Sequence, residues 1–345
     1  MVKIEVHVIS REIIKPSSPT IHNLQPYKLC LLDQLTPTSY APMMLFYPKS
    51  NEANMDDTQF LKHLKRSLSD TVLNVLYPFS GRVKTNMFVD RFDEGVSFME
   101  ARVNCSLSEF FEDPQIESLN QFLPCPPLAK ESQDDVTLLI FQLSVFSCGG
   151  LALDGCMSHK LGDGGTASTL FSAYQGSSSC DFEALLPNLA KASLVFPPRN
   201  DVPRQLFSLM TNGLWKTTAS QIKRFVFDAK TIETLMEKAR GESDLKPSRT
   251  GALSGFLGKR YMAASLALSG SPRPCILRYV VNLRERTEPL LFDGTIGNLF
   301  RTVGAVSKPE AGLELHELAI IISESIAKMD HQDFLKSLQG DEGFN

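Results

Sequence analysis

The chain has 345 residues, of which 43% are hydrophobic and 21% are charged, and this composition is ordinary for a globular protein with a large core. Its net charge of −4 argues against nucleic acid or an anionic membrane as the partner. The seven Cys residues are odd in number and form no CxxC pair, which indicates a reducing compartment rather than a disulfide framework.

The first residues alternate charged and apolar side chains, so they lack the continuous apolar core of a signal peptide. No apolar run reaches the roughly 20 residues that a membrane-spanning helix requires. We therefore expect a cytoplasmic protein. The length predicts two domains, which we place at residues 1–190 and 221–345. The crossover between them, residues 191–220, holds three prolines and no sustained period.

The first part of the chain predicts two strands, a helix and a hairpin. Residues 2–14 alternate in the manner of a strand, and residues 41–48 form an apolar segment bounded by prolines. In residues 56–77, which precede a proline, apolar side chains recur every three or four positions and indicate an amphipathic helix. Residues 87–103 then predict a hairpin that turns at residues 93–95.

The middle of the chain predicts a pair of buried strands. Residues 107–134 contain several prolines and predict a loop with a short helix. Residues 136–146 are an apolar run suited to a central strand, and a Cys-Gly-Gly turn leads back into residues 151–158. This second strand ends at His159, so the imidazole is presented from the rigid part of a sheet.

His159 is the candidate general base of the chain. An unperturbed histidine has a pKa of roughly 6.5, so it can take and return a proton near neutral pH. A second interpretation is open, because His159 is in phase with Leu151, Leu153 and Met157 along the strand and could be a hydrogen-bonded core histidine.

Asp163, four residues after His159, has three interpretations. It could orient the imidazole, turn away and hold the loop through a salt bridge, or cap the helix that begins at Gly164. That helix is predicted over residues 164–174. Gly164 would allow the chain to pass close beneath a ligand, whereas the Gly-Asp-Gly-Gly run lacks the spacing and lysine of a phosphate loop.

The second domain predicts further strands and helices. Residues 223–228 resemble a strand, residues 229–240 a helix, and residues 276–282 a strand that leads to Arg284. A last helix is predicted over residues 313–338.

Ser248 and Arg249 begin another predicted helix, which we expect to turn an apolar face inward. The side chains of this face are Leu253, Phe256, Leu257 and Met262. A helix N-terminus beside an arginine suits an anion, but an ordinary serine cap with a solvated arginine explains the same residues.

Several of these segments belong to a series of motifs. The series comprises Lys15-Pro-Ser-Ser-Pro-Thr20, Leu32-Asp33-Gln34, Leu76-Tyr-Pro-Phe-Ser-Gly-Arg82, His159-Lys-Leu-Gly-Asp163-Gly164, Lys223-Arg-Phe-Val-Phe227, Val281-Asn282-Leu283-Arg284 and Gly297-Asn298. In content and order it resembles the plant BAHD family of acyl-CoA-dependent acyltransferases, most closely the vinorine synthase branch. The run at His159 resembles the HxxxDG motif of that family.

The resemblance implies an α/β protein with a two-domain chloramphenicol acetyltransferase-like fold, in which mixed sheets are flanked by helices. It implies that His159 activates a small-molecule alcohol that attacks an acyl-CoA, with acetyl-CoA as the favoured donor. Asp163 would form a salt bridge with Arg284, and Ser248 and Arg249 would lie near the CoA phosphates. It further implies a monomer that needs no metal and no permanently bound cofactor.

The sequence departs from the family in one respect. The family's DFGWG signature does not occur, and the single tryptophan is Trp215. We therefore expect an incomplete C-terminal domain. The alternative function is that of a catalytically impaired relative that only binds a ligand or partner.

A serine hydrolase is disfavoured, because the sequence has no GxSxG motif and Gly251-Ala-Leu-Ser-Gly255 has the wrong spacing.

Overall fold

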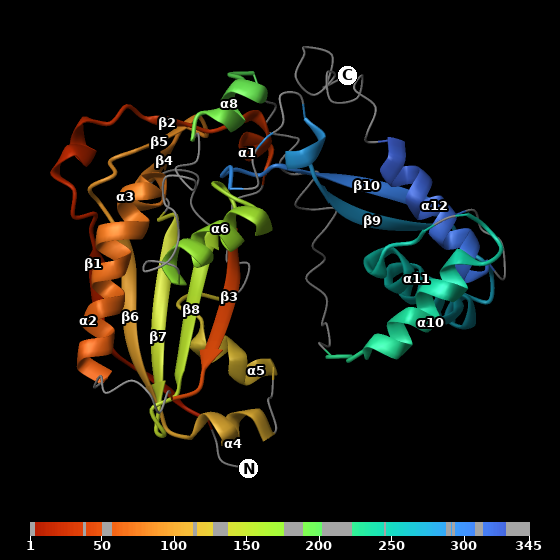
Figure 1. Cartoon of the computed structure of the whole chain (residues 1–345), viewed down its shortest axis with the longest axis horizontal. Helices are drawn as coiled ribbons and strands as arrows, with labels where there is room; N and C mark the ends of the chain where they lie inside the picture. The colour runs from red at the N-terminus through yellow and green to blue at the C-terminus, as the bar shows by residue number, and fades with distance from the viewer. Residues whose placement is uncertain are drawn as a thin grey trace. The chain divides into compact units, whose positions relative to one another are not determined.

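The computed structural model describes residues 4–36, 39–49, 57–112, 116–126, 137–175, 189–201, 223–244, 246–287, 291, 294–307 and 313–328 (Figure 1). The chain forms two compact units, the first from Met1–Thr218 with Leu291–Leu299 and the second from Ala219–Leu290 with Phe300–Asn345. This division differs from the predicted one, because the first unit extends past residue 190 and takes back Leu291–Leu299.

A five-stranded mixed sheet is the centre of the first unit (Figure 1). Its strands are β1 (Val6–Ile14), β3 (Tyr40–Tyr47), β6 (Val96–Val103), β7 (Leu139–Phe146) and β8 (Leu151–Ser158). Their order is β1-β6-β7-β8-β3, with β6 and β7 parallel and the other neighbours antiparallel. The four strands predicted around residues 2–14, 41–48, 136–146 and 151–158 are thus confirmed, and the strand that leads to His159 lies inside the sheet.

The helices of the first unit cover the sheet and its ends. They are α1 (Leu31–Leu35), α2 (Asp57–Ser67), α3 (Leu73–Val75), α4 (Leu107–Glu112), α5 (Ile116–Leu119), α6 (Gly164–Gln175) and α8 (Lys191–Val195). A π-helical turn at Leu68–Val72 joins α2 to α3, so the predicted helix over residues 56–77 is present with one irregular turn. Short 3-10 helices occur at Pro19–Asn23, Tyr77–Ser80 and Asn120–Phe122.

The two faces of β8 belong to different apolar clusters. Leu153 packs in the main core with Leu170 and Phe171 of α6, whereas Ala152 belongs to a cluster with Phe110 and Phe146. Successive side chains of a strand point to opposite faces of the sheet. The sheet is therefore covered on both sides, and its end at His159 is held rigidly.

The predicted hairpin over residues 87–103 is wrong. β5 (Phe88–Asp90) pairs with β4 (Arg82–Lys84) and β2 (Tyr27–Lys28) in a separate three-stranded sheet, while β6 belongs to the large sheet. The tight turn lies instead between β4 and β5, where Thr85 and Asn86 have positive φ angles of 51° and 58°. Without a glycine this turn gives little signal in the sequence.

In its described residues, the second unit packs three helices with a two-stranded antiparallel sheet. Its elements are α10 (Ala229–Arg240), α11 (Arg249–Ser269), β9 (Cys275–Asn282), the 3-10 helix Arg284–Arg286, β10 (Phe300–Ser307) and α12 (Leu315–Ala327). The predicted helix over residues 313–338 is present as α12, and its part beyond residue 328 lies outside the described residues. No helix in the described part of the chain is long and apolar enough to cross a membrane.

One prediction for the second unit is wrong, because residues 223–228 form no strand, and Phe225 and Val226 are 71% and 82% exposed. The predicted inner face of α11 is confirmed in part, since Leu253 and Phe256 pack against the apolar cluster of this unit, whereas Leu257 is half exposed. The buried residues of α11 are small and include Gly258, where a Cβ atom would lie 2.9 Å from Leu277 Cδ1.

Asp154 is a buried carboxyl in the middle of β8. Its side chain is 0% exposed, and neither carboxyl oxygen has a hydrogen-bond partner among the described residues. Burial raises the pKa of Asp154 to about 8, because the charged form loses its hydration and gains nothing in return.

This carboxyl predicts a stability that falls as the pH rises. Because its folded-state pKa of about 8 exceeds the unfolded value of about 3.9, the folded protein keeps a proton that the unfolded chain loses between those values, so the stabilisation is full below about pH 4 and is lost by about pH 8. We expect the melting temperature of the unmodified protein to fall more steeply between about pH 4 and pH 8 than that of Asp154→Asn, by several degrees. Equal slopes in thermal denaturation would contradict the assignment.

Candidate active site

His159 follows β8 at the end of the large sheet. Its backbone N–H donates to the carbonyl of Ser39 at 2.8 Å, and the N–H of the preceding Ser158 donates to Leu138 at 2.8 Å. The backbone is thus held by segments on both sides of β8, so the half-buried imidazole is attached to a fixed point of the chain.

Asn298, which is distant in the sequence, contacts both the imidazole and the backbone carbonyl of His159. Its side-chain Oδ1 lies 2.9 Å from Nδ1 of His159, and its Nδ2 donates to the His159 carbonyl oxygen at 2.7 Å. Both residues belong to the first unit, because Leu291–Leu299 returns to it. From the sequence, Gly297-Asn298 is only one motif of the series and has no predicted contact with His159, since 139 positions separate the amide from the imidazole.

The hydrogen bonds of Asn298 assign the tautomer of His159. Nδ2 of Asn298 donates both to the His159 carbonyl and to Oδ1 of Asp33, so the other amide atom, which faces the imidazole, is the oxygen. An amide oxygen only accepts, so Nδ1 of the neutral imidazole must carry the hydrogen. The lone pair is then on Nε2, which is the form that a general base needs.

Asp163 holds the start of α6 and the returning segment. Its Oδ1 accepts the N–H of Thr166 at 2.9 Å, as a helix-capping carboxylate does, and its Oδ2 accepts the N–H of Leu299 at 3.0 Å. The geometry therefore bears out the capping interpretation of Asp163. Arg284 lies in the second unit, where its buried side chain and its backbone N–H both bond to Oδ1 of Asn282.

Gly162, rather than Gly164, is the tightly packed glycine of the loop. A Cβ atom at Gly162 would lie 2.4 Å from Cγ2 of Thr166, whereas one at Gly164 would meet no atom within 4 Å. Thr166 also exchanges two hydrogen bonds of 3.0 Å with the backbone of Gly297. The open space beside Gly164 leaves room for a ligand at the start of α6.

Lys160 and Asp33 connect the loop to α1. The buried Lys160 Nζ donates to the carbonyl oxygens of Asp33, Gln34 and Thr36 at 3.1, 3.2 and 2.6 Å, which stabilises the C-terminal end of this helix. Burial raises the pKa of the Asp33 carboxyl, and the hydrogen bonds from Cys30 and Asn298 oppose that rise. The sequence analysis assigned no function to either residue.

Ser248 and Arg249 occupy the N-terminus of α11. Oγ of Ser248 accepts the N–H of Gly251 at 3.0 Å, so this hydroxyl caps the helix, and Arg249 is exposed.

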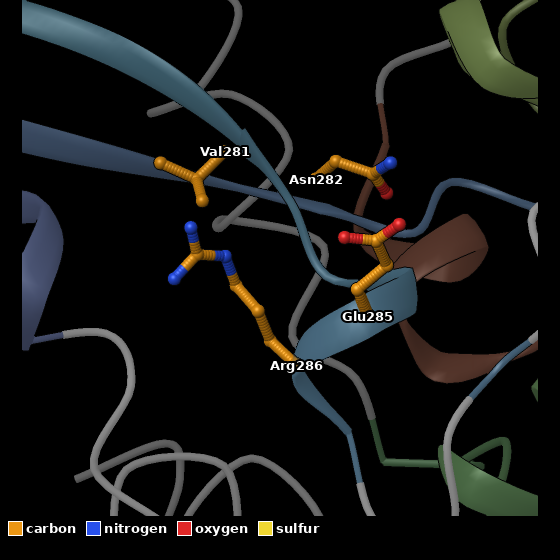
Figure 2. A pocket seen from close by; sticks show the side chains of 4 residues that line it. All are labelled: Val281, Asn282, Glu285 and Arg286. Atoms are coloured by element: carbon orange, nitrogen blue, oxygen red, sulfur yellow. The ribbon is translucent and has the colours of Figure 1, made fainter. Parts of the chain in front are cut away.

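A separate cavity of about 380 Å³ lies at the end of β9, where Val281, Asn282, Glu285 and Arg286 line it (Figure 2). Among the described residues no cluster of three or more His, Cys, Asp or Glu could hold a metal ion.

Comparisons with known proteins agree with these motifs. A family model described as the Transferase family matches residues 4–341. The chain belongs to this family, the BAHD acyltransferases. Epi-neemfruitin B 7-O-acetyltransferase of Melia azedarach is 37% identical over 99% of this chain and 77% of that protein. Vinorine synthase of Rauvolfia serpentina is 33% identical over 97% of this chain and 79% of its own length.

The crystal structure of vinorine synthase has the same fold, with a TM-score of 0.78 and 31% identity over 93% of this chain and 76% of that chain. The predicted chloramphenicol acetyltransferase-like α/β fold, with its mixed sheet flanked by helices, is thereby confirmed. By enzyme class the chain is an O-acyltransferase.

The packing at Gly162 predicts a stability difference between two glycine substitutions. Gly162→Ala forces its methyl group into Thr166 and should lower the free energy of unfolding by about 1–3 kcal/mol. Gly164→Ala is the matched control and should change it by less than about 1 kcal/mol, because open space surrounds that position. Urea denaturation of both variants measures the difference, and equal destabilisation would refute this account of the loop.

Proposed function

We propose that this chain transfers an acetyl group from acetyl-CoA to a hydroxyl of a plant specialised metabolite, such as an alkaloid or terpenoid, with His159 as general base. The observation that carries the proposal is the hydrogen bond between His159 and Asn298, since it leaves the lone pair on Nε2. The relatives named as acetyltransferases of a limonoid and of stemmadenine support this class of acceptor.

The mechanism uses one residue for both proton transfers. Nε2 of His159 removes the proton from the acceptor hydroxyl as its oxygen attacks the thioester carbonyl. The tetrahedral oxyanion that forms is stabilised by backbone N–H groups at Gly164 and Gly165, in the first turn of α6, where N–H groups have no intrahelical acceptor. The C–S bond then breaks, and the imidazolium returns its proton to the CoA thiolate. The products are the ester and free CoA.

Asp163 acts as a structural support in this proposal. Its carboxylate accepts bonds from Thr166 and Leu299, so it holds the loop and the returning segment together rather than relaying a proton. It thereby supports the position of His159 without contacting the substrate.

The N-terminus of α11 is the proposed contact for the phosphates of CoA. Ser248 already caps the helix through Oγ, which leaves Arg249 as the residue that supplies positive charge there. The enzyme is proposed to act as a cytoplasmic monomer with acyl-CoA as co-substrate and no permanently bound cofactor.

Replacement of His159 tests the general-base role. We expect His159→Ala to lower kcat by about 10²–10⁴-fold, because the acceptor hydroxyl is no longer deprotonated. The measurement is thiol release from acetyl-CoA in the presence of a panel of alcohols, including limonoid and alkaloid alcohols. His63→Ala, which replaces an exposed histidine of α2, is the control and should keep full activity. No alcohol-dependent release from the folded unmodified chain would refute the proposed function and favour a non-catalytic relative.

Arg249→Gln tests the CoA contact. We expect KM for acetyl-CoA to rise about tenfold, which corresponds to about 1.4 kcal/mol and is typical of one charge-assisted hydrogen bond. kcat should change little, because the phosphates lie away from the reacting carbonyl. The control is Arg260→Gln on the same helix, where the guanidinium lies 5.2 Å from the centre of the Phe256 ring. Equal KM values for the two variants would exclude a phosphate contact by Arg249.

A further inference from the structure

Asp33 of α1 is a buried carboxylate that the proposed mechanism does not yet use. It is 0% exposed. Its Oδ1 accepts hydrogen bonds from the backbone N–H of Asn298 at 2.7 Å and from Nδ2 of Asn298 at 3.0 Å. Its Oδ2 accepts the backbone N–H of Cys30 at 2.9 Å. These contacts are N–H donors, so they select the ionised carboxylate, which only accepts.

This carboxylate and the His159 carbonyl together determine which way the Asn298 amide points. If the amide were rotated by half a turn, its oxygen would face the Asp33 carboxylate and the His159 carbonyl, and two hydrogen bonds would become contacts between oxygens. Such contacts are strongly unfavourable in a buried site. Oδ1 of Asn298 is therefore kept against Nδ1 of His159.

Lys160 makes α1 and the His159 loop a single rigid element. The residue adjoining His159 in sequence donates three hydrogen bonds to carbonyls of residues 33–36, and one of these carbonyls belongs to Asp33 itself. Asp33 and His159 are thus fixed relative to each other through Asn298 on one side and Lys160 on the other.

From these contacts we infer that Asp33 is a positioning residue for acyl transfer, an inference that rests on the proposed function of His159. Through Asn298, the Asp33 carboxylate keeps the hydrogen of the neutral imidazole on Nδ1 and the lone pair on Nε2. It acts through Asn298 on His159 and contacts neither the acceptor nor acetyl-CoA.

The direct test is the ¹⁵N spectrum of histidine-labelled protein at a pH where His159 is neutral. The resonances of Nδ1 and Nε2 show which nitrogen carries the hydrogen, and His159→Gln identifies the His159 signals among the six histidines. We expect the Nδ1–H form in the unmodified chain. In Asp33→Leu the Asn298 amide loses the charged acceptor of its Nδ2, so its orientation is less strongly fixed and a share of the Nε2–H form should appear. An Nε2–H form in the unmodified chain would overturn the inference.

Kinetics supply the second test. Asp33→Leu should lower kcat by about 10–10²-fold with little change in KM, since a base in the wrong tautomer cannot accept the proton although the substrates still bind. A merely structural role for Asp33 predicts no change of tautomer and no such split between kcat and KM.

Asp154→Asn is the matched control, because it neutralises another buried carboxyl of the same unit and should leave both the tautomer and kcat unchanged. Circular dichroism establishes that each variant folds. If Asp33→Leu does not fold, the tautomer of the unmodified chain decides, because an Nε2–H form there overturns the inference. If no form of the chain releases CoA, the proposed function fails, while the spectra still test the positioning by Asp33. An unchanged tautomer and kcat in folded Asp33→Leu would refute it.

Discussion

The hydrogen bond between Nδ1 of His159 and Oδ1 of Asn298 is the interaction on which the candidate site depends. It exists only because Leu291–Leu299 returns to the first unit after the chain has built most of the second. Three side chains hold this segment there: Asp33 bonds to Asn298, Asp163 to the N–H of Leu299, and Thr166 to Gly297. The imidazole of His159 is therefore oriented by a segment of its own unit that is separated in sequence from the rest of that unit.

The buried carboxyls of the first unit show which contacts offset the free-energy cost of burying a carboxyl group. Asp33 and Asp163 accept hydrogen bonds from N–H groups, so their burial is offset by charge-assisted hydrogen bonds. Asp154 is equally buried but has no such donors in the described part of the chain, and its pKa rises to about 8. The two satisfied carboxylates organise the site, and the unsatisfied one lies five positions before His159 in the strand without contributing to it.

The sequence predicted what local patterns encode. Strand β8 and helix α6 follow from the apolar period on either side of a glycine-containing loop, so the position of His159 at a strand end was foreseeable. The contacts of Asn298 with His159 and with Asp33 span 139 and 265 positions, and no period connects them. The same limit explains the wrongly predicted hairpin, since the sheet membership of β5 depends on partners distant in the chain.

The residues of the motif that begins at His159 each have a separate function. Lys160 stabilises the end of α1, Gly162 allows close packing against Thr166, and Asp163 caps α6 and holds Leu299. Of the side chains in the motif, the proposed chemistry requires only the imidazole, because a tautomer fixed by Asn298 already places the lone pair on Nε2. The spacing of His159 and Asp163 therefore reflects the geometry of a strand, a turn and a helix start. In that geometry Asp163 stabilises the surroundings of the base, whereas the orientation of the imidazole comes from Asn298.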